Sequence, residues 1–105
     1  MEQGLNPFWP KGVPAEVRVP RVPLTHCVQT AAQRHPDKPA VVFAGATLPY
    51  AGLWQRVQAL AGYLQQRLGV QPGDRVLLLS QNCPQFLVAC YGIQRAGAAV
   101  VPVNP

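Results

Sequence analysis

The sequence predicts an α/β fold in which a β-α-β unit is preceded by an extended, proline-rich arm. Two continuously apolar segments, residues 75–80 and 98–103, flank an apolar helical segment at residues 85–96. Apolar runs without polar alternation are typical of strands in parallel sheets, which are covered on both faces. Parallel strands need a crossover connection, so the order strand, helix, strand predicts a β-α-β unit. Five prolines in residues 1–23 predict the arm.

The arm, residues 1–23, has no hydrophobic period that would favour a helix or a central strand. Phe8 and Trp9 leave two interpretations open. Either the arm packs across the rest of the chain and buries these aromatic rings, or it is a mobile leader.

After the arm, the pattern predicts a short helix and a hairpin. Thr25 is suited to cap a helix over residues 25–34, since its hydroxyl can accept a bond from an N–H of the first turn. The apolar runs at residues 40–43 and 47–49, separated by a turn at Gly45, predict two short paired strands.

Residues 50–68 have the clearest helical pattern in the chain. Apolar side chains recur every three or four residues, and glutamines and arginines occupy the other face. Gly69 is suited to a left-handed C-cap, and residues 72–74 form a turn that leads to the strand at 75–80. The predicted buried positions are Leu53, Val57, Leu60, Ala61, Leu64 and Leu68.

The helix at residues 85–96 is apolar almost all round, so we expect it to be largely buried. Pro84 suits its first position, and Gly97 suits its end. We expect a doubly covered strand at residues 98–103 to need further layers, and therefore expect this chain to be the first part of a longer α/β protein.

Composition excludes several classes of protein. Of the 105 residues, 49% are hydrophobic and 12% are charged, which excludes a disordered polyelectrolyte. No uninterrupted run of about 18 apolar residues is present to span a membrane. The first residues lack a basic cluster followed by an apolar stretch, so we expect a cytoplasmic location.

The net charge of +5 does not predict nucleic-acid binding. The nine basic residues are scattered singly and do not alternate with aromatic residues, as a base-stacking surface requires. Lys11, Arg18 and Arg21 in the arm could contact the inner face of a membrane, but so small a basic cluster limits such contact to a peripheral one at most.

The three cysteines predict free thiols. They cannot all pair, and on one helix Cys83 and Cys90 would be separated by roughly 10 Å of rise. His26 and His35 do not form a zinc-ligand spacing with Cys27. We therefore expect the cysteines to be small buried apolar residues, with no metal site.

No motif predicts a catalytic, cofactor-binding or metal-binding residue. The sequence lacks GxxxxGK, GxGxxG, GxSxG and HExxH patterns. Residues 10–12, Pro-Lys-Gly, lack the preceding Ser/Thr/Gly-rich segment of a phosphate loop. Asp74 with Arg75, and Asp37 with Lys38, are typical of turns.

The amino-acid sequences of several segments are more specific than these general patterns. GDRVLLL (73–79), QNCPQF (81–86) and IQRAGAAVVPVNP (93–105) closely resemble the N-terminal region of AMP-forming acyl-CoA synthetases, in the adenylate-forming superfamily. TLPYAGL (47–53), HPDKPAVVF (35–43) and GVPAEVRVPRVPL (12–24) extend the resemblance, the last to long-chain fatty-acid CoA ligases.

Two positions depart from the family pattern, and a third favours one of its branches. Pro49 is inserted where the family commonly moves straight from Thr to Tyr. Cys83 replaces the usual serine at a helix cap, which weakens the cap by about 1 kcal/mol. Asn104 is more similar to the fatty-acyl ligases than to peptide-synthetase adenylation domains, which usually have Asp there.

The resemblance implies that residues 24–105 are a partial β-α-β layer of the large N-terminal domain of the adenylate-forming fold. It implies a parent enzyme that uses Mg²⁺-ATP to convert a fatty acid to an acyl-adenylate and then transfers the acyl group to CoA. The family's phosphate loop, adenine motif, ribose-binding Asp and catalytic Lys have no counterpart in residues 1–105. The chain alone is therefore predicted to be inactive, with the remainder of its own domain as its partner.

Two alternatives remain open. The parent could belong to another adenylate-forming branch, an aryl-CoA ligase or a peptide-synthetase adenylation domain. The chain could instead be a stand-alone, non-catalytic module, although the polar outer strand face and closing helix that this requires are missing. A DNA-binding domain is disfavoured, because the helix at 85–96 carries only Arg95.

Overall fold

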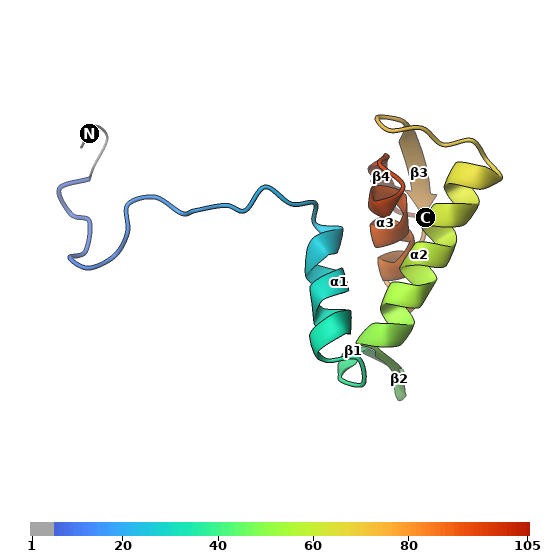
Figure 1. Cartoon of the computed structure of the whole chain (residues 1–105), viewed down its shortest axis with the longest axis horizontal. Helices are drawn as coiled ribbons and strands as arrows, with labels where there is room; N and C mark the ends of the chain where they lie inside the picture. The colour runs from blue at the N-terminus through green and yellow to red at the C-terminus, as the bar shows by residue number, and fades with distance from the viewer. Residues whose placement is uncertain (1–5) are drawn as a thin grey trace.

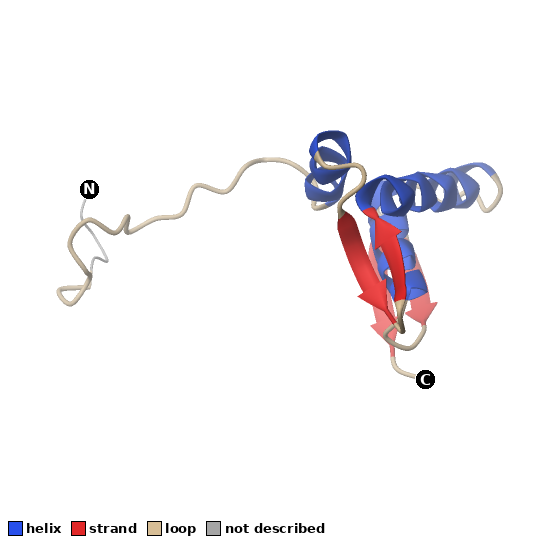
Figure 2. Cartoon of the chain, turned by 90° about the horizontal axis from the view of Figure 1, so that it is seen from below, coloured by secondary structure: helices blue, strands red, loops and turns tan. Residues whose placement is uncertain are grey.

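The computed structural model describes residues 6–105, which form three helices and four strands. The strands make two separate pairs, β1 with β2 and β3 with β4 (Figures 1 and 2). In chain order the elements are α1 (Thr25–Arg34), β1 (Pro39–Phe43), β2 (Ala46–Pro49), α2 (Tyr50–Gln66), β3 (Arg75–Leu79), α3 (Pro84–Arg95) and β4 (Ala99–Val103).

The helix α2 is the centre of the fold, since it contacts α1, α3 and the β1–β2 hairpin. The prediction of its buried face is confirmed for four residues spaced by three or four positions. The helix ends at Gln66, two residues before the predicted end, and Leu68 is 60% exposed. The four buried residues are Leu53, Val57, Ala61 and Leu64.

Where α2 meets α3, Gly92 lets the two helices approach closely. A Cβ atom at Gly92 would lie 2.7 Å from Cδ2 and 3.1 Å from Cβ of Leu60. Rotation of the Leu60 side chain would relieve the first contact. The second involves the atom next to the α2 backbone, so the helices would have to separate by a few tenths of an ångström. Two buried clusters share this packing, one of Ala61, Leu64, Ile93, Ala96 and Ala98, the other of Val28, Leu53 and Val57.

The predicted β-α-β unit is confirmed. Strands β3 and β4 are parallel and in register from Arg75↔Ala99 to Leu79↔Val103. At the start of the pair, the Gly73 N–H donates to Gly97 O at 3.0 Å and the Ala99 N–H donates to Asp74 O at 2.7 Å. Gly97 ends α3 with a φ of 87°, which only glycine adopts without strain.

The prediction that β3 is covered on both faces is wrong for these 105 residues. Val76 and Leu78 are half-buried against the α2–α3 cluster. Leu77 and Leu79, which alternate with them, are 65% and 61% exposed, because helices cover only one face of the pair. Helix α3 is likewise less buried than predicted: only Gly92 and Ile93 are fully buried.

The predicted hairpin and first helix are confirmed, with one correction at the helix cap. Strands β1 and β2 pair antiparallel around Ala44 and Gly45, whose φ values of 50° and 79° suit a tight two-residue turn. Leu24, and not Thr25, occupies the N-cap of α1. Thr25 is the first helical residue and is 2% exposed, so tertiary packing places it inside.

The arm is extended over residues 6–23 and leads away from the rest of the chain (Figure 1). Phe8 is 89% exposed, and the Trp9 indole N–H donates locally to Val13 O at 2.8 Å. The interpretation in which the arm buries its aromatic rings across the body is therefore wrong here. Residues 1–5 of the predicted arm lie outside the described residues. The radius of gyration, 17.8 Å, exceeds the ~13 Å of a compact chain of this length because of the arm.

Gly62 on α2 and Gly92 on α3 form a matched test of the close contact between these two helices. We expect Gly92→Ala to destabilise the fold by about 1–3 kcal/mol, because the added methyl group overlaps Leu60. We expect Gly62→Ala to stabilise it by up to about 1 kcal/mol, since a Cβ there meets open space and alanine favours helix. Urea unfolding of the polypeptide that contains this chain measures both, and equal stabilisation by the two changes would contradict the close approach.

Candidate functional site

The carboxyl ends of β3 and β4 lie at the same edge of the parallel pair. In open α/β sheets, ligands bind in the crevice outside the carboxyl ends of the strands. Here β3 leads through residues 80–83 to the start of α3, and β4 is followed by Asn104. We therefore take this edge as the candidate functional site.

The loop after β3 brings a hydroxyl and a thiol together. Cys83 has extended backbone angles and occupies the N-cap of α3, with Pro84 directly after it, as predicted. Ser80 Oγ lies 3.8 Å from Cys83 Sγ and donates to Gln81 O at 3.0 Å. The Phe86 N–H donates to Cys83 O at 3.0 Å, so the first turn of α3 is anchored on Cys83.

This setting lowers the pKa of the Cys83 thiol from its ordinary value. The largest cause is the backbone N–H of Phe86, followed by the Ser80 hydroxyl, with a smaller contribution from the Gln85 N–H. Burial opposes them by raising the pKa. Amide hydrogens at a helix N-terminus stabilise a thiolate, so Cys83 has more thiolate character than an ordinary cysteine.

An apolar hollow of about 400 Å³ adjoins this loop, between the hairpin and the start of α3. It has room for an apolar group, and its only polar side chains are an amide and the thiol. The Cys83 thiol is its only titratable lining group, since no carboxylate, imidazole or ammonium group lines it. Its lining residues are Val41, Phe43, Asn82, Cys83, Pro84, Phe86 and Leu87.

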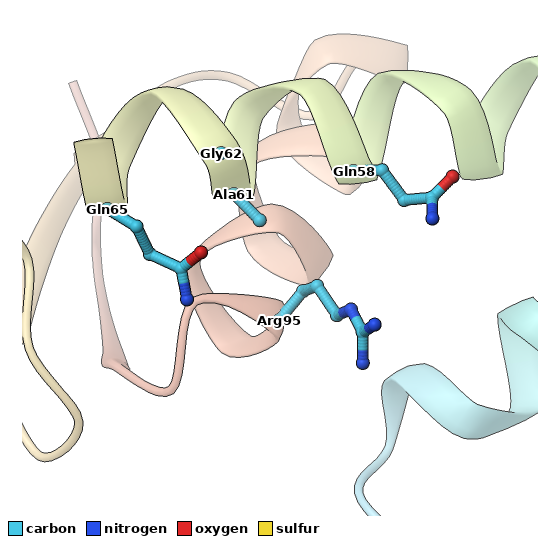
Figure 3. Close-up of a pocket in the computed structure, with 5 residues that line it drawn as sticks. All are labelled: Gln58, Ala61, Gly62, Gln65 and Arg95. Atoms are coloured by element: carbon cyan, nitrogen blue, oxygen red, sulfur yellow. The ribbon is translucent and has the colours of Figure 1, made fainter. Parts of the chain in front are cut away.

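A second hollow, of about 410 Å³, lies where α2 and α3 pack (Figure 3). Gln58 and Gln65 project from α2 on either side of Ala61 and Gly62, and Arg95 projects from α3. The Gln65 amide donates to Ala96 O at 3.5 Å. The Arg95 guanidinium lies over the Trp54 ring, 5.5 Å from its centroid. Sequence reasoning missed this pocket, because it depends on the register between two helices.

The structure does not bring the polar residues considered in the sequence into one site. His26 and His35 are exposed, and His26 Nε2 lies 3.4 Å from Thr30 Oγ1 on the same helix. Asp74 has the predicted turn role, since its carboxylate accepts from the Gln71 N–H at 2.8 Å. Lys11 is exposed in the arm.

The three cysteines are free, but the prediction that they are buried is wrong. Cys27 is exposed, and Cys83 and Cys90 are half-buried. Among residues 6–105, no three His, Cys, Asp or Glu residues gather closely enough to hold a metal ion.

Comparison with known proteins identifies the family. Residues 28–105, about three quarters of the chain, match the family of AMP-binding enzymes. The chain belongs to this family. It is also 45% identical over 98 residues to a long-chain-fatty-acid–CoA ligase from Salmonella typhimurium, a match that covers 92% of this chain and 18% of the ligase. The chain thus spans about a fifth of the length of this curated relative.

Solved structures of similar proteins agree with the predicted fold class. A putative long-chain-fatty-acid CoA ligase from Rhodopseudomonas palustris matches with a TM-score of 0.74 and 34% identity, over 79% of this chain and 21% of that one. The N-terminal subdomain of NpsA from Klebsiella oxytoca matches with a TM-score of 0.73 and 28% identity, over 78% of this chain and 21% of that one. The chain therefore has the fold of a segment of the N-terminal subdomain of an AMP-binding enzyme.

The thiols of this chain should react at different rates. We expect a maleimide or iodoacetamide reagent to label Cys83 faster than Cys90, because the first is at a helix N-terminus and has a lowered pKa. The labelling rate of Cys83 should rise with pH from a lower pH than that of an ordinary cysteine thiol. Ser80→Ala should shift the Cys83 profile to higher pH, since it removes a hydroxyl that lowers the pKa of this thiol. Mass spectrometry of quenched samples measures each site; equal, fast labelling of Cys83 and Cys90 would contradict this placement.

Proposed function

We propose that this chain is the N-terminal scaffold segment of a long-chain fatty-acid CoA ligase. The observation that carries the proposal is the 45% identity to such a ligase over 92% of the chain, within a matched AMP-binding family. In the proposed reaction the carboxylate of a fatty acid attacks the α-phosphorus of ATP, which forms an acyl-adenylate and releases pyrophosphate. The thiol of CoA then attacks the acyl carbon, which forms the thioester and releases AMP.

ATP, Mg²⁺ and CoA are the proposed cosubstrates and metal of the parent enzyme. The described residues do not fit a magnesium site, which needs converging carboxylates: Glu16 lies in the arm, and Asp37 and Asp74 lie in two separate turns. We therefore assign no step of the reaction to these residues. Their proposed contribution is to hold the β3–β4 layer on which a larger domain is built.

The proposed partner of residues 24–105 is the remainder of the AMP-binding domain, with residues 1–23 as a separate arm. The exposed face of β3–β4 supports this proposal, since four large apolar side chains on two adjacent strands make a contiguous patch that soluble proteins cover. These side chains are Leu77, Leu79, Val101 and Val103.

The proposed location is the cytoplasm, with membrane contact at most peripheral. None of the helices described here is long and apolar enough to cross a bilayer.

The exposed apolar face of β3–β4 should cause the isolated 105-residue chain to associate. We expect this chain to self-associate and to enhance ANS fluorescence, and we expect Leu77→Gln with Leu79→Gln to reduce both effects. Val17→Gln with Val19→Gln is the matched control, because these valines are also exposed but lie in the arm. Light scattering and dye titration measure the outcome. A monodisperse wild-type chain with a cooperative melt and no dye binding would instead favour the alternative that the chain is a stand-alone, non-catalytic module.

Activity tests separate the ligase branches. With the full polypeptide that contains this chain, we expect ATP–pyrophosphate exchange to depend on a long-chain fatty acid and thioester formation to depend on CoA. Residues 1–105 alone should give no exchange. Exchange that depends on an amino acid or an aryl acid would instead assign the parent to another adenylate-forming branch, and no exchange with any carboxylate would contradict the enzyme proposal.

A further inference from the structure

We draw no further inference here: the strongest candidate, the apolar hollow that Cys83 lines between the β1–β2 hairpin and the start of α3, is an unpartnered apolar surface, and nothing in the structure shows what covers it.

Discussion

The close contact of α2 with α3 is the constraint on which the rest of this structure depends. Gly92 permits this contact, because a Cβ atom there would lie 2.7 Å from Cδ2 and 3.1 Å from Cβ of Leu60. With the helices this close, two buried clusters form along α2, one toward α1 and the hairpin and one toward β3 and β4. The β3–β4 pair is positioned by the same contact, since its half-buried side chains pack on residues of both helices.

This arrangement leaves the parallel pair covered on one face only. Leu77 and Leu79, which are exposed on β3, are as apolar as the half-buried Val76 and Leu78, which is unusual for a solvated face. The match covers about a fifth of the N-terminal subdomain of NpsA, which is a much longer chain. This difference in length explains why one face of the strand pair is uncovered here. A strand that is apolar on both faces from Val76 to Leu79 is adapted to two covering layers, and the described residues contain one.

The surface chemistry follows from the ends of the helices and not from a catalytic constellation. At the start of α3, the backbone N–H of Phe86 and the Ser80 hydroxyl act on the thiol of Cys83. At the end of α3, Arg95 lies over an aromatic ring of α2. Both features depend on where α3 begins and ends, which Pro84 and Gly97 determine.

Local chemistry was sufficient to predict most of the elements, because helix periodicity, proline and glycine act over a few residues. The sequence by itself therefore determined α2 and its buried face, the hairpin, the parallel β-α-β unit and the extended arm. Only the tertiary structure decided which apolar faces are covered, that Thr25 is buried and not a cap, that the arm leaves Phe8 exposed, and that Arg95 meets Trp54. These depend on contacts between residues far apart in the chain, and burial is a property of the whole packed assembly, which no local pattern specifies.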